Sequence, residues 1–489
     1  MKSYIRIFWV VAMVSVLGAC TPKGVDITRF GLEDAVIAED LGVFPQDLAV
    51  YAERAGKDTA LMEPARQGGE DARFDANFFS PWDAGVPLLS KNDAFEALLN
   101  MDPGKGFAEN LRPWPRERWQ AIVANANMDG YGAVPARPAI TVGTAHLRRL
   151  PTEFPYFLDP GRGGEGFPFD YMQSSTLWLG TPVAVTHVSR DGMWAFAQTG
   201  LVSGWTRVTN LAAVDRNFIR TWRSRPLAVF VQDNVVLAAR DRMDAVANGR
   251  VAAEAQVGTI LPFATVKGRI EVAKSPHVFV HVPLRASDGN AVMATAFAPM
   301  YAARQKPLHL TPQNVALIGN AMMGQPYGWG GLFGQRDCSA AMHDLFAPFG
   351  IWLPRNSSPQ GAMGARVELG GLSPDGKEEK IMREGLPFFS LVGMPGHIGL
   401  YLGAYPRPDG KGGEREVPVM FHNVWGVRVA PGQGENRREG RGVIGKAVVT
   451  GLRYGAEHPE ISSPASVLDR ITGLAVLPDP LPGERATRR

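Results

Sequence analysis

Cys338 needs a chemical explanation, because the chain offers it no disulfide partner. The chain has 489 residues and two cysteines, and the other, Cys20, closes a predicted export signal. Cys338 lies between Asp337 and Ser339 at the start of a run with helical apolar spacing, which predicts that it occupies the first turn of a helix. There the positive end of the helix dipole and the unpaired backbone N–H groups lower the pKa of a thiol and hold an oxyanion. The sequence therefore predicts a nucleophilic cysteine.

A nucleophilic cysteine needs a base, and His397 has the most suitable surroundings of the nine histidines. It lies in Met394–Gly403, which alternates like a β-strand, with Gly396 and Gly399 leaving room for the imidazole. His422 lies in the next predicted strand. If the two strands are antiparallel neighbours, His422 can hydrogen-bond His397 and fix its tautomer, although a structural role for His422 is an equal alternative. The other seven histidines are interpreted as structural or surface residues.

Composition excludes some other classes of function. Lys plus Arg number 51 against 48 for Asp plus Glu, so there is no electrostatic argument for nucleic acid binding. Cys338 has no Cys or His neighbour at the spacing of metal ligands, so we expect no metal site and no cofactor. The 55 glycines and 38 prolines indicate many turns and short strands.

Residues 1–19 are predicted to be a lipoprotein signal peptide, with a positive start and an apolar run, 7–17, that is too short to span a bilayer stably. Leu17–Cys20 resembles the lipobox of bacterial lipoproteins, which implies lipidation of Cys20. A plain signal peptide with a chance cysteine is the alternative. The residue after Cys20 is Thr21. Asp at this position would favour retention in the inner membrane. We therefore expect a periplasmic protein, anchored by lipid to the outer membrane.

The elements that must position the site follow from changes of pattern along the chain. Residues 30–130 have helical periodicity with aromatic-rich pieces between. From Pro138 short alternating strands take over, including a hairpin with its turn at Asp191-Gly192. The strand at Gly204-Trp205 resembles that of a bacterial SH3 domain. A helix over 312–324 then begins by the N-cap and proline rule, and all the predicted chemistry lies beyond it.

Four motifs follow one another between residues 310 and 455: Pro326-Tyr327-Gly328-Trp329-Gly330-Gly331, Asp337-Cys338-Ser339, Leu353-Pro354-Arg355-Asn356-Ser357-Ser358-Pro359-Gln360, and Gly396-His397-Ile398-Gly399. In this order they resemble the NlpC/P60 family of papain-like cell-wall peptidases. The layout of the whole chain is similar to that of γ-D-glutamyl-L-diamino acid endopeptidases. The resemblance implies an α+β fold, in which a papain-like domain follows a mainly helical segment and two SH3-like β-barrels (SH3b).

The domains predicted on this basis are the signal peptide (1–19), the lipid anchor and helical stabilising region (20–136), SH3b domain 1 (137–212), SH3b domain 2 (213–305), the NlpC/P60 peptidase domain (306–460) and a C-terminal tail (461–489). We expect a monomer that acts on peptidoglycan stem peptides.

The resemblance also implies a reaction, which is hydrolysis of the bond between γ-D-glutamate and a diamino acid, usually meso-diaminopimelate. An acyl-enzyme forms on Cys338, His397 moves the protons, and His422 orients His397. Relatives with this layout restrict the cleft to peptides with a free N-terminal L-Ala. The substrate-binding positions implied are Asp337, Ser339, Asn356 and Ser357.

Two departures from the family pattern concern recognition of the substrate amine. Asn356 stands where some relatives have Asp, and Val202 stands where they have a Tyr ahead of the SH3b tryptophan. Amine recognition is therefore assigned to the long loop of the first SH3b domain, with Asp170 and Tyr171 as candidates.

Two other classes of function remain open. One is a binding module that recognises peptidoglycan peptides without turnover. The intact Cys338, His397 and Asp-Cys-Ser context favour an enzyme over this module. The other is a papain-like amidase or acyltransferase on a different substrate, because the catalytic residues specify acyl transfer but not the acyl group.

Overall fold

The computed structural model describes residues 35–83, 89–133, 135–162, 165–239, 253–265, 276–429, 440–456 and 467–478. The predicted signal peptide, the predicted lipidation site Cys20 and most of the predicted C-terminal tail lie outside these residues. Within the described ranges, no helix is both long enough and apolar enough to cross a membrane.

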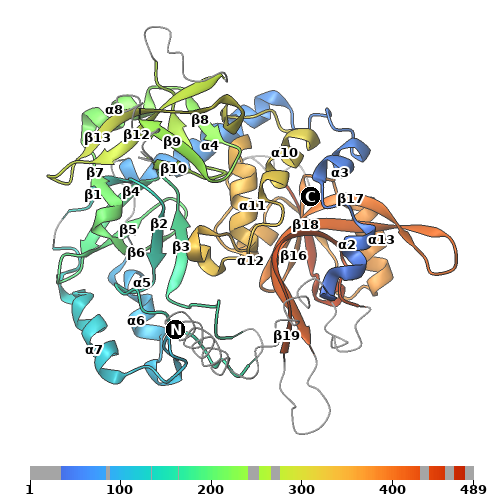
Figure 1. Cartoon of the computed structure of the whole chain (residues 1–489), viewed down its shortest axis with the longest axis horizontal. Helices are drawn as coiled ribbons and strands as arrows, with labels where there is room; N and C mark the ends of the chain where they lie inside the picture. The colour runs from blue at the N-terminus through green and yellow to red at the C-terminus, as the bar shows by residue number, and fades with distance from the viewer. Residues whose placement is uncertain are drawn as a thin grey trace, which may run out of the picture.

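The N-terminal segment is mainly helical, as predicted, and runs across the whole molecule (Figure 1). It starts beside the C-terminal domain, where α3 packs against helix α10 (Pro312–Met322), and it ends beside the first β-domain. Gly319 of α10 makes the first contact possible, because a Cβ there would lie 2.3 Å from Leu48. Its elements are η2 (Ala35–Ile37), α2 (Ala38–Val43), α3 (Leu48–Arg54), α4 (Pro64–Phe79), η3 (Ser80–Trp82), α5 (Lys91–Ala94), α6 (Glu96–Asn100), η4 (Pro103–Lys105), α7 (Arg116–Asn125) and η5 (Met128–Gly130).

The first β-domain is one antiparallel sheet of seven strands in the order β3-β2-β6-β5-β4-β1-β7. Its strands are β1 (Arg137–Thr141), β2 (Ala145–Arg148), β3 (Gln173–Leu177), β4 (Pro182–Val188), β5 (Trp194–Gln198), β6 (Ser203–Arg207) and β7 (Leu211–Ala213), with η6 (Val208–Asn210) before the last. The predicted β4–β5 hairpin is present, and Gly192 takes a φ of +71° in its turn. Trp205 on β6 is fully buried in the core.

The second β-domain consists of a four-stranded sheet, β10-β9-β13-β12, and a three-stranded sheet, β11-β8-β14. They share a core with Trp222 from the helix that precedes them. Its elements are α8 (Arg216–Arg223), β8 (Leu227–Phe230), β9 (Val235–Ala239), β10 (Ala253–Ala255), β11 (Ile260–Pro262), β12 (His277–Arg285), β13 (Ala291–Pro299), η8 (Met300–Ala302) and β14 (Ala303–Gln305). Its assignment as a second SH3-like barrel stays a prediction.

The C-terminal domain packs helices against a six-stranded antiparallel sheet in the order β15-β20-β16-β17-β18-β19. Its strands are β15 (Ala365–Glu368), β16 (Ser390–Met394), β17 (His397–Pro408), β18 (Glu414–Val429), β19 (Gly440–Gly451) and β20 (Gly473–Val476). Its helices, besides α10, are η9 (Trp329–Gly334), α11 (Cys338–Phe346), η10 (Ala347–Phe349), α12 (Ser357–Gly361), α13 (Pro374–Glu384) and α14 (Val467–Arg470). The fold is thus α+β. The predicted boundary at residue 461 is wrong, because β20 is an inner strand of this sheet.

Candidate active site

Helix α11 begins at Cys338, in agreement with the prediction that this residue lies on a first turn. The carboxylate of Asp337 caps the helix by accepting a hydrogen bond from the N–H of Ala340 at 2.8 Å. The N–H groups of Cys338 and Ser339 belong to the same turn, in which the helix itself supplies no acceptor. Cys338 is buried, with 5% of its surface exposed. It lies beside backbone N–H donors that can stabilise a negative charge on a ligand or on the sulfur.

His397 opens strand β17 immediately after a tight turn. The sequence predicted one strand through Met394–Gly403, whereas β16 ends at Met394 and the chain reverses at Pro395-Gly396. Gly396 takes a φ of +78°, which glycine adopts at little cost. Met394 consequently pairs with His397 across the hairpin, and the turn brings the imidazole to the end of the sheet.

The antiparallel pairing of β17 with β18 brings the two histidines together, as the sequence predicted. Nε2 of His397 lies 2.8 Å from Nδ1 of His422. The other nitrogen of His422 lies 3.0 Å from the hydroxyl of Thr450 on β19. Gly399 provides space for His422 rather than for His397, because a Cβ at 399 would lie 3.0 Å from the Cβ of His422. His422 is fully buried and held on both sides.

The thiol of Cys338 lies against the start of the same strand. The backbone N–H of Ile398 lies close enough to this thiol to oppose the rise in its pKa. Ile398 directly follows His397, and α11 packs on β17 along this stretch. Since Nε2 of His397 is occupied by His422, Nδ1 is the nitrogen of His397 that remains for a partner. The structure therefore unites the three predicted catalytic residues at one place.

The pKa shifts describe a neutral resting site. Burial raises the pKa of the Cys338 thiol to about 12, and the Asp337 carboxylate acts in the same direction. Burial lowers the pKa of His397 to about 4, helped by the positive charge of Arg470. The helix dipole is expected to lower the pKa of the free thiol, and burial acts in the opposite direction.

Asp337 and Ser339 flank Cys338 in the chain, and the side chain of Arg355 binds both of them. The guanidinium donates to both oxygens of Asp337, at 3.0 and 2.7 Å, and to the hydroxyl of Ser339 at 3.1 Å. Burial alone would raise the pKa of Asp337, but Arg355 and the capping N–H of Ala340 bring it below its usual value. Arg355 also donates to Ser175 of the first β-domain at 2.8 Å. This arrangement fixes the helix start to a neighbouring domain.

Asn356 and Ser357 follow Arg355 directly, at the start of α12. Asn356 is exposed, and its side chain makes no capping hydrogen bond to the helix. Ser357 is half-buried. Both predicted substrate-binding positions thus lie next to the residue that holds Asp337, and Asn356 has a side chain that is available to a ligand.

Asp170 and Tyr171, the predicted amine-binding pair, have different surroundings. Asp170 is buried and paired with Arg148 at 2.7 Å. It also accepts hydrogen bonds from the N–H groups of Tyr156 and Met172, both at 2.9 Å. This carboxylate is engaged within its own domain, which argues against the predicted contact with a substrate amine. Tyr171 does face the C-terminal domain, and its ring lies 5.8 Å from that of Trp329.

Two glycines let the first β-domain dock beside the site. The carbonyl of Gly330 accepts a hydrogen bond from Gln173 at 3.0 Å, and that of Gly331 accepts one from Thr176 at 2.8 Å. A Cβ at Gly331 would lie 2.2 Å from the hydroxyl of Thr176. Both glycines also have positive φ, of +57° and +84°. The Gly-Gly pair of the motif thus serves domain contact as well as turn formation.

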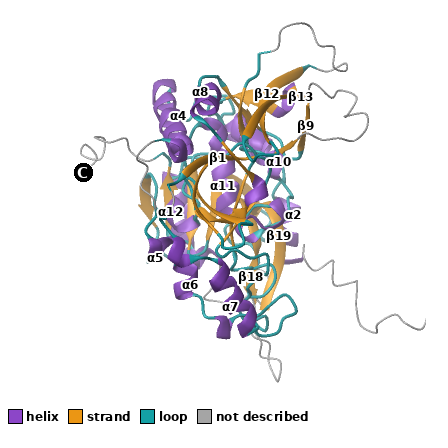
Figure 2. Cartoon of the chain, turned by 90° about the vertical axis from the view of Figure 1, so that its left-hand side faces the viewer, coloured by secondary structure: helices purple, strands orange, loops and turns teal. Residues whose placement is uncertain are grey.

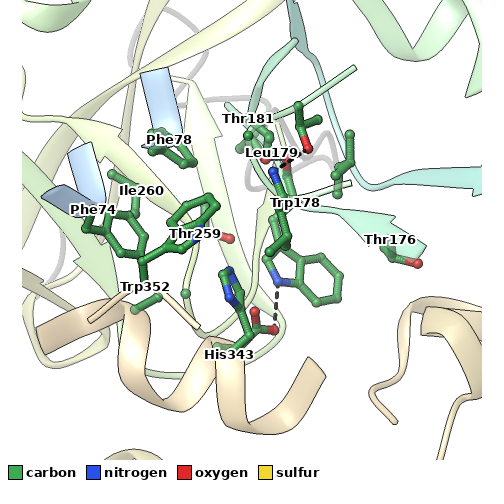
Figure 3. A pocket seen from close by; sticks show the side chains of 17 residues that line it. Phe74, Phe78, Thr176, Trp178, Leu179, Thr181, Thr259, Ile260, His343 and Trp352 are labelled. Carbon is green, nitrogen blue, oxygen red and sulfur yellow. Dashed lines mark hydrogen bonds between the residues drawn. The ribbon is translucent and has the colours of Figure 1, made fainter. Parts of the chain in front are cut away.

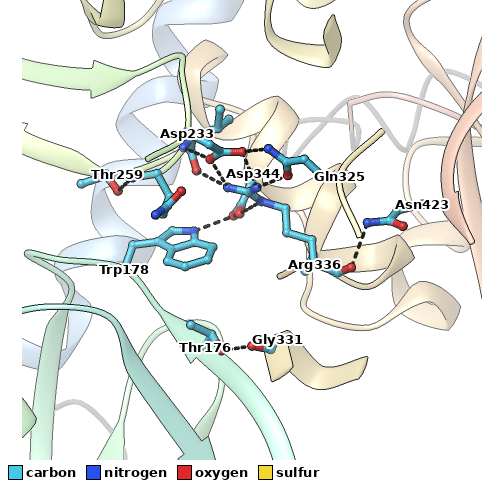
Figure 4. A network of polar contacts seen from close by, with 12 residues as sticks. Thr176, Trp178, Asp233, Thr259, Gln325, Gly331, Arg336, Asp344 and Asn423 are labelled. Carbon is cyan, nitrogen blue, oxygen red and sulfur yellow. Dashed lines mark hydrogen bonds and ion pairs between the residues drawn. The ribbon is translucent and has the colours of Figure 1, made fainter. Parts of the chain in front are cut away.

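Arg336 connects the site with both β-domains (Figure 4). Its buried guanidinium forms ion pairs with Asp233 of the second β-domain at 2.8 Å and with Asp344 of α11 at 2.6 Å. Trp178 of the first β-domain donates to the same Asp344 at 2.9 Å. The carbonyl of Arg336 accepts from Asn423, the neighbour of His422, at 2.9 Å. The residue two positions before the nucleophile therefore joins three domains and the histidine strand.

A small cavity of about 60 Å³ lies at the same junction (Figure 3). Its walls come from the N-terminal helix α4, both β-domains and α11. His343, interpreted from the sequence as a packing residue, lines it, with Nδ1 2.7 Å from the carbonyl oxygen of Leu353. Such a volume holds about two water molecules, so the four parts meet in a closely packed interface.

Some residues of the site were missed by the sequence analysis. Tyr327 was quoted only as part of a motif, but burial and its proximity to Cys338 and Asp337 raise its pKa well above the usual value. Thr450 had no local signal, because it meets His422 only across two paired strands. Among the described residues, no group of three or more His, Cys, Asp or Glu side chains is arranged to hold a metal ion.

The comparisons with known proteins agree with this arrangement. Residues 9–131 match the N-terminal NLPC_P60 stabilising domain, residues 155–207 match the SH3 domain of SH3b1 type, and residues 324–429 match the NlpC/P60 family. Residues 324–429 therefore form an NlpC/P60 domain. The NlpC/P60 match includes Cys338, His397 and His422.

Individual relatives of this NlpC/P60 protein are distant. One is a γ-D-glutamyl-L-lysine dipeptidyl-peptidase of Bacillus cereus (strain ATCC 10987 / NRS 248), 30% identical over 112 residues, which are 22% of this chain and 31% of that protein. The chain thus spans about a third of the length of this curated relative. An NlpC/P60 endopeptidase from Photobacterium damselae subsp. piscicida has the same fold, with a TM-score of 0.76, 24% identity and coverage of 89% of this chain and 97% of that one.

Proposed function

We propose that this protein is a cysteine endopeptidase that cleaves between γ-D-glutamate and a diamino acid, usually meso-diaminopimelate, in peptidoglycan stem peptides. The observation that carries the proposal is the buried Cys338 thiol at a helix start, beside an imidazole that a second histidine orients. The matched Bacillus cereus protein, whose name specifies a γ-D-glutamyl-L-lysine bond, supports the choice of acyl group and of diamino acid.

In the first half of the proposed reaction, Nδ1 of His397 takes the proton of Cys338 as the sulfur attacks the γ-carbonyl carbon. The carbonyl oxygen becomes an oxyanion, for which the N–H groups of Cys338 and Ser339 are suitable donors. His422 keeps His397 in the tautomer that presents a free Nδ1. The C–N bond then breaks, His397 gives its proton to the leaving amine, and a thioester remains on the sulfur.

In the second half, His397 takes a proton from a water molecule that attacks the thioester carbon. The second tetrahedral intermediate collapses, the sulfur leaves, and the γ-carboxylate of the product is released. The thiol then recovers its proton from His397. At physiological pH the imidazole of His397 is neutral and can accept a proton, because burial lowers its pKa to about 4.

The decisive experiment is cleavage of L-Ala-γ-D-Glu-meso-diaminopimelate followed by mass spectrometry. We expect L-Ala-γ-D-Glu and free diaminopimelate from the native protein and no product from Cys338→Ala. Binding of the peptide without cleavage by the native protein would instead support the peptide-binding module. We propose that the free L-Ala amine is required, with Tyr171 and Asn356 near it. Equal cleavage of the N-acetylated peptide would contradict that requirement.

We also propose that the protein works as a monomer on the periplasmic face of the outer membrane, anchored through lipid on Cys20. The support is the sequence at Leu17–Cys20, followed by Thr21. Replacement of Cys20 by Ala should remove metabolically incorporated palmitate and release the protein from the membrane fraction. Unchanged membrane association of Cys20→Ala would contradict the lipid anchor.

A further inference from the structure

A large cleft lies on the side of the first β-domain away from Cys338. Its volume is about 730 Å³, within the range of sites for small ligands. It is enclosed by the end of the N-terminal segment, by β1, β4 and β7, and by the turn between β12 and β13. In the sheet order, β1 and β7 lie at the opposite edge from β3, the strand that docks beside the active site. Figure 2 views this side, with β1 near the centre, α7 below it and β12 and β13 above.

The floor of the cleft is the open end of the small apolar core of this domain. Val185, Ala195, Val208 and Leu211 line it. Several core positions of this domain carry alanine, whose small side chains leave space at this end of the core. An apolar floor of this size is favourable for small aliphatic groups, because their burial removes apolar surface from water.

The rim of the cleft carries an excess of positive charge. Arg137, Arg190 and Arg285 line it, and the nearby carboxylate of Asp288 offsets part of the positive charge of Arg285. Arg285 is fixed toward the cleft, because its guanidinium donates to the carbonyls of Leu211 and Gly289, both at 2.9 Å. Asp288 is the one carboxylate among the described residues that line the cleft, and it accepts hydrogen bonds from Asn290 at 3.0 and 2.8 Å.

We propose that this cleft binds the C-terminus of a short peptide with small aliphatic side chains. The arginines suit a carboxylate, since guanidinium groups form paired hydrogen bonds with it. The walls also present the side-chain amides of Asn127 and Asn290, which suit the amide groups of a peptide. An acyl chain would need a wholly apolar tunnel, so these groups favour a peptide over a fatty acid.

The inference stands apart from the proposed peptidase activity. Among the residues that the structure describes, none from the C-terminal domain lines the cleft. If the proposed function holds as well, the second site would keep the enzyme near peptide-rich wall material while the active site is empty. Binding here is therefore measured with the catalytic cysteine replaced, so that a loss of activity and a loss of binding remain separate results.

The test uses the full chain with Cys338→Ala and ligand-observed NMR titration of three probes: tri-L-alanine, its C-terminal amide, and octanoate. We expect saturable binding of tri-L-alanine in the millimolar range and about tenfold weaker binding of the amide, which lacks the negative charge. The double variant Arg137→Gln, Arg190→Gln should weaken tri-L-alanine to a similar extent. Ala213→Phe, at an exposed position in the lining, should block the cleft.

The matched control is Arg112→Gln, Arg116→Gln, which removes two exposed arginines outside the cleft and changes the net charge equally. It should bind tri-L-alanine like its parent. Both double variants, made with Cys338 intact, should keep the parent peptidase activity. Equal binding of tri-L-alanine and its amide would overturn the proposal, as would binding that the cleft variants leave unchanged. Tighter, arginine-dependent binding of octanoate would overturn it in favour of a fatty-acid site.

Discussion

Replacing Asp233 by alanine should loosen the second β-domain from the catalytic helix without touching a catalytic side chain. Asp233 accepts hydrogen bonds from both terminal nitrogens of Arg336, at 2.8 and 2.9 Å, and from the N–H of Val257 at 2.7 Å. The side chains of Arg336 and Asp233 are only 3% and 5% exposed. Breaking a buried pair by removing one partner costs about 3–5 kcal/mol. Because Arg336 would still be paired with Asp344 in the variant, we expect Asp233→Ala to lower the free energy of unfolding by about 3 kcal/mol, the lower end of this range.

The assay is urea unfolding together with kcat/KM for the murein tripeptide. The control is Asp83→Ala, which removes a surface ion pair with Arg223 whose partners are 45% and 38% exposed, and which should cost less than about 1 kcal/mol. Asp233→Ala should also lower kcat/KM at urea-free conditions, because Arg336 positions both the helix start and Asn423. If Asp233→Ala and Asp83→Ala lose the same stability and keep full activity, the bracing role assigned to Arg336 is wrong.

Three further results follow from the site. With a base of pKa about 4, kcat/KM should stay level below pH 6 and fall only near pH 4; a fall centred near 6.5 would contradict the shift given for His397. The pKa of His422 in the folded protein lies well below its unfolded value of about 6.5. Below pH 6.5 the unfolded chain therefore binds a proton that the folded chain does not, so the contribution of His422 to stability is full above pH 6.5 and declines as the pH falls. His422→Gln should make this decline shallower, as measured by thermal unfolding at a series of pH values. Gly331→Ala should lower the melting temperature more than Gly324→Ala, because both have positive φ but only 331 would meet Thr176; equal losses would show that the close approach does not matter.

The sequence predicted what depends on local pattern. The helix start at Cys338 followed from apolar spacing, and the pairing of His397 with His422 followed from two consecutive strands. It failed where tertiary contacts decide. The turn at Gly396 interrupts a stretch whose alternation continues through it, so one strand was predicted where two exist. β20 is only four residues long, too short for a period to stand out.

The electrostatics were the least predictable part. A helix N-terminus indicates a low thiol pKa when water is present, but the degree of burial depends on the packing of several domains. Asp170 is a similar case, since its partner Arg148 lies 22 positions earlier and becomes a neighbour only through strand pairing. The side chain of Asp170, which looked available in the sequence, is therefore paired with Arg148 in the folded protein.

The N-terminal segment limits how far this protein can be divided into independent modules. Phe44, Leu48 and Tyr51 belong to the same buried cluster as the helix and strands that carry the catalytic residues. A fragment beginning near residue 306 would expose that apolar surface to solvent and tend to associate through it. Residues more than 250 positions away from Cys338 along the chain are thus a constituent part of the folding unit that performs the chemistry.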